Sequence, residues 1–590
     1  MIARVYPFAC TLPTYGVELA SRLAPLFVMG KAPLYPYTNF VRTEKQAHPR
    51  TYQMWALENR YLRALVAPEL GGRVYSLRDK RLPTPAGRSG PGAELLYDNS
   101  AIKPIRIEPR SAWICAGIEF NFPVAHSHTS LEPVASRAYA AGGRACVEVG
   151  ETERRLGLSW VVRLSLGADD PFLTQETFLR NPSPRPARWQ FWSNAGIDGF
   201  DDTEMVYAPA EIFVHETKGG KMRWPTEWKC IGEREGMLGL FWMDQRDLYF
   251  GAFHHRLGVG LLHLADPKVV PGMKLWTFGR KGTYEWAKIV SDDARGYAEV
   301  QSGAFKTQEE FGTLAPGEER YFVEFWTGAA AVDEYAKAAL PRPGLTAEPP
   351  RWFGMEHIPE AQRWLKLLEA HARQEPARIP DYNPADIDWP PTGLELEATL
   401  RWAAEHRSAY HTALGTWLAA RGKYAEACAA LARSEDPCGL RVEGILAWRH
   451  ERNLPKARAL FERANLDDLG HQLDYDALLA HLGDYAARAE HLARMNREDG
   501  RVVERLADQA VATGRPQEAL DLLLKRTWQR QHEHFVRSDI WRRARAALGL
   551  TQDPVPAELG EDAVPPVTQA PTPHGTLDGL LRRVPELPAL

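Results

Sequence analysis

Tyr61-Leu-Arg-Ala-Leu-Val-Ala-Pro68, followed directly by Glu69-Leu-Gly-Gly-Arg-Val-Tyr-Ser-Leu-Arg-Asp-Lys80, has the pattern of two consecutive β-strands. Aliphatic and aromatic residues favour strand structure in both halves. Gly71-Gly72 interrupts the pattern because glycine accepts backbone conformations that other residues avoid. The stretch therefore predicts one strand that ends near Pro68 and a second that begins after Gly72.

The same pattern continues on both sides of this pair, to about residue 335. Strand-like segments recur at short intervals, with Gly, Pro and Asp between them: 146–149, 158–166, 172–180, 189–192, 249–253 and 321–326. This spacing is typical of a large antiparallel sandwich. We expect residues 1–335 to form an all-β super-sandwich with more strands per sheet than an immunoglobulin domain.

The second half of the chain has a different composition, rich in Ala, Leu, Arg and Glu, which favour helices. Residues 336–400 predict a Pro-rich connector with one helix over 359–373. Residues 401–550 predict all-α helical hairpins, because the loop residues Gly422, Asn453, Gly483 and Gly514 recur about every 30 residues. This array resembles tetratricopeptide repeats, although a single irregular helical domain is the alternative. Residues 551–590 predict a poorly packed Pro-rich tail.

The bulk composition excludes several classes of protein. The 590 residues carry 72 basic and 76 acidic side chains, a formal net charge of -4, so no nucleic-acid or anionic-membrane partner is expected. The six cysteines form no CxxC pair, and no apolar run reaches the roughly 18 residues of a membrane span. Without a recognisable signal peptide, a cytoplasmic location is expected.

One stretch, Trp113-Ile-Cys-Ala-Gly-Ile-Glu-Phe-Asn-Phe-Pro-Val-Ala-His-Ser-His128, places a single carboxylate in an apolar, aromatic run. Glu119 either points out of a sheet into a site or is buried with a raised pKa, and both arrangements serve proton transfer. The alternative is an edge-strand glutamate facing water, with His126 and His128 in a loop behind it. An HxH pair on a strand can bind a metal, but no motif supplies a third ligand, so neither a metal nor another cofactor is expected.

A second carboxylate, Glu299, lies in a similar aromatic context, and Gln301 shares its face of the predicted strand. Glycosidic bond cleavage uses two carboxyl groups, whereas anomer interconversion needs a base on O1–H and an acid on O5. We assign catalytic roles to Glu119, Glu299, His126 and His128. The predicted substrate-binding residues are Arg73, Lys274 and Gln301 for hydroxyl groups, Trp192 and Trp276 for stacking on sugar rings, and Asp198, His215 and His254 as further contacts.

These segments together resemble a bacterial family with an uncharacterised N-terminal domain and tetratricopeptide-type repeats. The shared pattern comprises 35–37, 68–74, 79–80, 117–123 with His126, 194–202, 271–279 and 297–303. The Pro68-Glu-Leu-Gly-Gly-Arg73 segment also resembles the opening of galactose-mutarotase-like (aldose 1-epimerase) domains. That resemblance implies a carbohydrate-binding super-sandwich. Phe120 and Phe278 stand where the family pattern has tryptophan, so an aromatic ring is kept.

The leading hypothesis is therefore a glycoside hydrolase acting on short oligosaccharides. One alternative is an aldose 1-epimerase-like isomerase that uses a glutamate and a histidine. The other is a non-catalytic sugar-sensing scaffold, whose repeats would bind a protein partner, or self-associate, through exposed aromatic residues such as Trp448 or Trp528.

Overall fold

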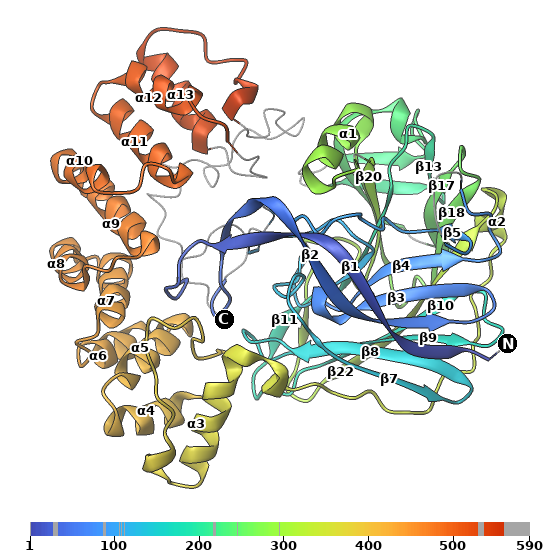
Figure 1. Cartoon of the computed structure of the whole chain (residues 1–590), viewed down its shortest axis with the longest axis horizontal. Helices are drawn as coiled ribbons and strands as arrows, with labels where there is room; N and C mark the ends of the chain where they lie inside the picture. The colour runs from blue at the N-terminus through green and yellow to red at the C-terminus, as the bar shows by residue number, and fades with distance from the viewer. Residues whose placement is uncertain are drawn as a thin grey trace. The chain divides into compact units, whose positions relative to one another are not determined.

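The computed structural model describes residues 2–26, 34–85, 90–105, 107, 109–110, 112–215, 220–244, 246–293, 295–528 and 536–559. The chain divides into two compact units. The sandwich unit comprises Met1–Val17, Thr43–Ile105 and Ala112–His357, and the helical unit comprises Glu18–Arg42, Arg106–Ser111 and Ile358–Leu590. In Figure 1 the strands run from blue to yellow-green and the helices of the helical unit from yellow to red.

The larger sheet of the sandwich unit contains twelve strands among the described residues. These are β1 (Arg4–Leu19), β2 (Phe40–Glu58), β3 (Leu62–Ala67), β4 (Arg73–Asp79), β5 (Ala93–Glu94), β6 (Ile118–Asn121), β12 (Trp192–Asp198), β14 (Ala210–Val214), β15 (Lys221–Trp224), β16 (Glu235–Trp242), β19 (Gly272–Phe278) and β20 (Tyr297–Gly303). Their spatial order is β1-β2-β3-β4-β6-β12-β20-β19-β16-β14-β15, with β5 paired to β4. Strand β6 is thus an interior strand of the sheet.

Eight further strands form the second sheet: β7 (Ala135–Ala141), β8 (Arg144–Thr152), β9 (Ser159–Gly167), β10 (Leu173–Arg180), β13 (Thr203–Tyr207), β17 (Tyr249–His254), β18 (Val259–Ala265) and β22 (Glu319–Ala329). β11 (Ala187–Trp189) and β21 (Gly312–Leu314) pair separately, and helices α1 (Gly279–Val290) and α2 (Asp333–Lys337) complete the unit. One hydrophobic core contains side chains from both sheets, including Leu275 and Val300 from the larger and Leu164 and Trp326 from the smaller. This shared core makes the unit a β-sandwich.

The two strands predicted around the glycine pair are β3 and β4, which pair antiparallel. Gly71 and Gly72 have φ angles of 71° and 76°. A β-carbon on Gly71 would lie 2.9 Å from the backbone of Ser130. Both the left-handed backbone and this close approach therefore require glycine.

The helical unit consists of helix pairs, as the recurring loop residues predict. Its helices are α3 (Gln362–Ala372), α4 (Glu397–His406), α5 (Tyr410–Ala420), α6 (Tyr424–Leu431), α7 (Pro437–Arg449), α8 (Leu454–Ala464), α9 (Leu469–Leu482), α10 (Tyr485–Ala493), α11 (Gly500–Ala512), α12 (Pro516–Leu524) and α13 (Val536–Ala547). Gly422, Gly483 and Gly514 follow the first helix of three pairs with positive φ, and the Asn453 side chain caps α8. Within the predicted tail, residues 560–590 lie outside the described residues.

The domain boundaries differ from the prediction at one place. The sequence places residues 18–42 in the sandwich, whereas in the structure this segment packs within the helical unit. Ala24 and Leu26 join the core of its first helices, and Tyr35 donates a hydrogen bond to the carbonyl of Pro390 at 2.8 Å. Arg441 donates to the carbonyl of Ala24 at 3.0 Å. The sequence prediction missed this packing because strand-like segments lie on both sides of residues 18–42, and local periodicity carries no information on distant packing partners.

No helix in the described part of the chain is both long enough and apolar enough to cross a lipid bilayer.

Candidate active site

One face of the larger sheet carries polar side chains, and the opposite face carries the apolar side chains of the core. On β6, Ile118 and Phe120 belong to the core, so Glu119 between them points to the other face. On β20, Ala298 and Val300 enter the core in the same way. Side chains alternate along a strand, so Tyr297, Glu299 and Gln301 lie on the polar face together.

The strand register brings these polar residues into rows. Glu119 pairs with Asn194 on β12, Asn194 with Gln301 on β20, and Gln301 with Lys274 on β19. In the next row Glu299 pairs with Trp276. Directly opposed residues of antiparallel strands point to the same face. Glu119, Lys274 and the neighbouring pair Glu299 and Gln301, which come from three separate parts of the sequence, therefore lie on one face of the sheet with Trp276 beside them.

Glu119 accepts three hydrogen bonds at one carboxylate oxygen. Its Oε2 lies 2.9 Å from Nδ1 of His126, 3.1 Å from Nε1 of Trp113 and 3.3 Å from Nδ2 of Asn121. Arg73 Nη2 lies 3.9 Å from the other oxygen, Oε1. Burial alone would raise the pKa of Glu119, but the charges of His126 and Arg73 and the hydrogen bonds lower it below its usual range. The alternative of a raised pKa is therefore wrong, and Glu119 is a buried carboxylate.

His126 is the more accessible member of this pair. Its side chain is 22% exposed, whereas that of Glu119 is 5% exposed. Burial favours the neutral imidazole, but the Glu119 carboxylate outweighs it and raises the pKa of His126, and Glu299 adds to the effect. A raised pKa favours the imidazolium form, which can give up a proton near neutral pH.

Glu299 is held at both carboxylate oxygens. Tyr297 donates its hydroxyl to Oε1 at 2.8 Å, and Gln301 donates its amide to Oε2. Gln308 in turn donates to Oε1 of Gln301 at 3.0 Å, and Lys274 Nζ donates to Oε1 of Gln308 at 2.6 Å. Lys274 Nζ also lies 4.9 Å from the ring centroid of Trp276, which packs edge-on against His215 with 5.6 Å between ring centroids. Glu299, Gln301, Lys274, Trp276 and His215 thus form one continuous network of polar and aromatic contacts, in which Glu299, Gln301 and Lys274 are buried.

Arg73 does not occupy the predicted position, in which its guanidinium would contact substrate hydroxyl groups. Its buried guanidinium donates to the backbone carbonyls of Leu70, Ala116 and Ser130 at 2.9, 2.8 and 3.0 Å. These N–H donors are hydrogen-bonded to backbone carbonyls, so Arg73 supports Glu119 from inside the protein.

Trp192 lies on the polar face, one row from Asn194, but its side chain is 0% exposed. Its indole donates to Gln190 Oε1 at 3.1 Å and its ring packs against Phe241 with 5.9 Å between centroids. The ring is covered by other protein atoms, so it is not accessible for stacking on a sugar.

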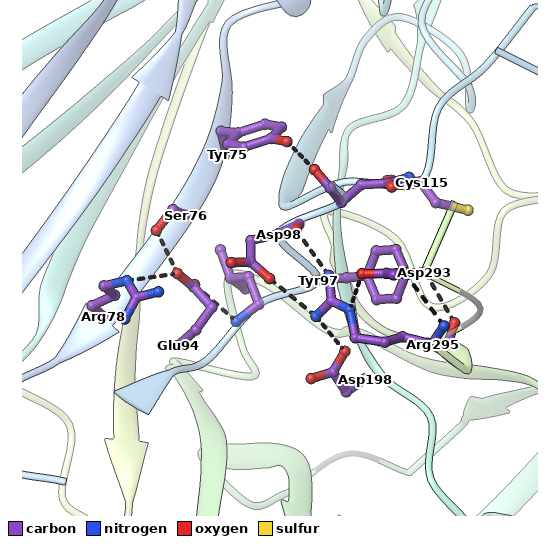
Figure 2. A network of polar contacts seen from close by, with 12 residues as sticks. Tyr75, Ser76, Arg78, Glu94, Tyr97, Asp98, Cys115, Asp198, Asp293 and Arg295 are labelled. Carbon is purple, nitrogen blue, oxygen red and sulfur yellow. Dashed lines mark hydrogen bonds and ion pairs between the residues drawn. The ribbon is translucent and has the colours of Figure 1, made fainter. Parts of the chain in front are cut away.

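Two other predicted residues, Asp198 and His254, lie apart from Glu119 and its hydrogen-bond partners His126, Trp113 and Asn121. Asp198 is at the far end of β12, where Figure 2 shows Arg295 placed among Asp98, Asp198 and Asp293. His254 belongs to the smaller sheet, where its Nδ1 is 2.8 Å from Thr203 Oγ1. His128 is buried in the loop that follows β6.

The histidines 126 and 128 lie in this loop and not on a strand, so the side-by-side HxH geometry expected of a strand is absent. Within the residues that the structure describes, no three His, Cys, Asp or Glu side chains are placed to hold a metal ion.

Sequence reasoning missed Tyr297 and Gln308 as parts of the predicted site, and it assigned no role to Asn194. Tyr297 carried a usable signal, because it precedes Glu299 and Gln301 at two-residue spacing on the same strand. Gln308 carried none, because it lies in the irregular loop after β20. Its role depends only on how that loop folds back over Lys274 and Gln301.

The opposite pKa changes of Glu119 and His126 predict a stabilising effect limited to a pH window. The lowered pKa of Glu119 contributes stability above about pH 4.5, and this contribution is lost as pH falls through its folded-state pKa. The raised pKa of His126 contributes stability below about pH 6.5, and this contribution is lost as pH rises through its folded-state pKa. We expect His126→Gln to reduce the free energy of unfolding by about 1–2 kcal/mol between these values and by less at pH 9.

Urea unfolding from pH 4 to 9 measures this difference. His255→Gln is the matched control, because His255 Nε2 contacts Glu204 at the similar distance of 2.8 Å but its side chain is 47% exposed. Solvent screens such a pair, so its loss should change stability less. A His126→Gln difference that is constant from pH 5 to 9 would contradict the prediction.

Comparison with known proteins identifies relatives of the whole chain. A family profile described as a domain of unknown function, DUF5107, matches residues 29–328, and a second profile, described as a C-terminal domain, matches residues 364–544. The crystal structure of a TPR-domain containing protein from Parabacteroides distasonis is similar with a TM-score of 0.87 and 30% identity, over 95% of this chain and 98% of that chain. These matches confirm the predicted uncharacterised N-terminal domain followed by tetratricopeptide-type repeats.

Two further structures are similar to about half of the chain. A galactose mutarotase-like protein from Clostridium acetobutylicum has 13% identity and a TM-score of 0.34, over 47% of this chain and 95% of that chain. A putative aldose 1-epimerase from Klebsiella pneumoniae has 11% identity and a TM-score of 0.36, over 48% of this chain and 82% of that chain.

Proposed function

The chain belongs to the DUF5107 family, and we propose that its sandwich unit is a carbohydrate-active enzyme that interconverts the anomers of a free aldose. This is an aldose 1-epimerase-type reaction. His126 is the general acid, Glu299 is the general base, and Glu119 keeps His126 oriented and protonated. The observation that carries the proposal is the His126–Glu119 pair at 2.9 Å, with the more accessible imidazole electrostatically coupled to Glu299.

The reaction follows from these roles. Glu299 accepts the proton of the substrate O1 hydroxyl while the His126 imidazolium donates a proton to the ring oxygen O5. The C1–O5 bond breaks as C1=O1 forms, so the substrate becomes the open-chain aldehyde. Rotation about C1–C2 presents the other face of the aldehyde. On ring closure Glu299 returns its proton to O1, and the O5 hydroxyl returns its proton to His126. Both residues thereby regain their starting protonation states.

Glu119 is the orienting group in this arrangement. A carboxylate that accepts a hydrogen bond from Nδ1 fixes the imidazole ring. It leaves Nε2 as the nitrogen that exchanges a proton with the substrate. The lowered pKa of Glu119 keeps it ionised, and that negative charge stabilises the imidazolium. Arg73 and Trp113 hold the carboxylate in place from the protein side.

The side chains beside the acid and the base have the chemistry that sugar binding requires. Lys274, Gln301 and Gln308 supply hydrogen-bonding groups, and the partly exposed ring of Trp276 supplies an apolar face for sugar C–H groups. The resemblance of residues 68–73 to galactose-mutarotase-like domains supports the same substrate class.

Glycoside hydrolysis is the second candidate, because Glu119 and Glu299 lie on the same face of the sheet. A glycosidase needs one carboxylic acid that retains its proton until the leaving group takes it. The lowered pKa of Glu119 argues against that role for Glu119, so Glu299 would have to be the acid. This requirement is why we place the isomerase first.

The burial of two tryptophans argues against the hypothesis of a non-catalytic sugar-sensing scaffold. That hypothesis requires exposed aromatic residues on the helical repeats, but Trp448 is 1% exposed and Trp528 is partly buried. Binding of a protein partner, or self-association, through the repeats stays a prediction.

Polarimetry of freshly dissolved α-D-glucose, α-D-galactose and α-D-mannose with the full-length protein tests the proposal, alongside a panel of aryl glycosides and short oligosaccharides. We expect faster mutarotation of at least one aldose and no release of aglycone. Release of aglycone without faster mutarotation would establish the hydrolase instead. If neither occurs although a sugar raises the melting temperature, the protein is a sugar-binding scaffold.

A further inference from the structure

Asn194 is the one site amide in the described residues whose side chain makes no hydrogen bond. It lies on β12, and its side chain is buried, with the residue 4% exposed. Neither Oδ1 nor Nδ2 has a partner among the described residues. Buried amide groups are normally hydrogen-bonded, because an unsatisfied donor or acceptor loses its interactions with water and gains nothing in return.

The neighbouring amides show that the site otherwise satisfies this rule. Gln301 donates to Glu299 and accepts from Gln308. Asn121 donates to Glu119 and accepts from the backbone N–H of Ser127 at 2.9 Å. Asn194 therefore differs from two amides that share its sheet face.

The register places Asn194 directly between Glu119 and Gln301. Side chains opposed in this way have Cβ atoms about 4.5–5.5 Å apart. Oε1 of Glu119 also makes no hydrogen bond among the described residues, although Arg73 lies 3.9 Å away. One donor, Asn194 Nδ2, and two acceptors, Asn194 Oδ1 and Glu119 Oε1, thus lie on neighbouring strands, and the other oxygen of Glu119 contacts His126.

We propose that Asn194 is a substrate-binding residue that recognises two adjacent hydroxyl groups of a pyranose. One hydroxyl oxygen accepts from Nδ2, and the neighbouring hydroxyl donates to Oδ1, while Glu119 Oε1 accepts from the first hydroxyl. An amide offers this donor and acceptor pair in a single plane, which suits a vicinal diol. The inference rests on the proposed function, because it assumes that the face occupied by His126 and Glu299 binds a sugar. It assigns the sugar's position relative to the acid and the base.

Asn194→Leu separates a binding role from a structural one, because leucine has a similar volume and no polar atoms. We expect the melting temperature of the ligand-free variant to be unchanged or higher, since an unsatisfied buried amide is removed. We also expect kcat/KM for mutarotation of the best aldose among D-glucose, D-galactose and D-mannose to fall ~10- to 100-fold. The increase in melting temperature caused by that aldose should disappear.

Asn59→Leu is the matched control, since Asn59 is also buried but donates to the carbonyls of Gly167 and Asp170 at 2.7 and 2.8 Å. It should lower the melting temperature of the ligand-free protein. An Asn194→Leu variant that loses as much thermal stability as Asn59→Leu, or that responds to the aldose as the wild type does, would overturn the inference alone. A wild type that neither accelerates mutarotation nor gains stability with any of the three sugars would overturn the proposed function, and the inference with it.

Discussion

Replacement of His126 by glutamine is expected to slow protein-catalysed mutarotation by ~10²- to 10⁴-fold, the range of contribution of a general acid or base. Glutamine keeps a hydrogen-bonding group near Glu119 but cannot donate a proton to O5. Glu299→Gln removes the base and should cause a loss of similar size. Because the acid and the base act in the same step, the double variant should lose little more than the larger single loss.

The measurement is kcat/KM by polarimetry on the aldose that the wild type accelerates most. His255→Gln is again the control, because it removes a histidine paired to a carboxylate on the other sheet. It should retain wild-type activity. Mutarotation by His126→Gln at the wild-type rate would rule out His126 as the acid, whatever the effect of Glu299→Gln.

Replacement of Arg73 by leucine is expected to reduce the free energy of unfolding of the sandwich unit by ~3–5 kcal/mol, the range for breaking a buried ion pair. The buried carbonyls of Leu70, Ala116 and Ser130 would lose their donor. Glu119 would lose a positive neighbour, so its pKa should rise. Urea unfolding at pH 7 measures the stability loss.

Arg60→Leu provides the comparison, because the Arg60 side chain is 48% exposed and pairs with Asp169 at 3.2 Å on the surface. A surface ion pair of this kind contributes about 0–1 kcal/mol. Equal small losses from Arg73→Leu and Arg60→Leu would show that Arg73 does not stabilise Glu119 and the buried carbonyls around it.

The candidate site illustrates what alternation along a strand can predict. Glu119 stood out because a carboxylate between Ile118 and Phe120 must face away from the side that those residues bury. The same reasoning put Glu299 and Gln301 on one face. In both cases the prediction needed only the two-residue period of a strand, which is a property of the local backbone.

Asp198, His254 and Arg73 show where that reasoning fails. Asp198 shares β12 with Asn194 but is bound by Arg295, which arrives from the segment before β20. His254 belongs to the other sheet, and the backbone carbonyls around Arg73 come from three separate segments. Apart from Leu70, none of these partners is near in sequence to the residue it holds.

Local sequence was enough to predict the two architectures, the glycine pair between β3 and β4, the repeat of the helical hairpins, and the shared face of Glu299 and Gln301. All of these depend on the conformational preferences of neighbouring residues and on the period of hydrophobic positions. Three features required the three-dimensional structure: the strand order that aligns Glu119, Asn194, Gln301 and Lys274, the loop that brings His126 to Glu119, and the packing of residues 18–42 in the helical unit. Those contacts join residues far apart in the chain, and their energies depend on the burial and charge of partners that local sequence does not specify.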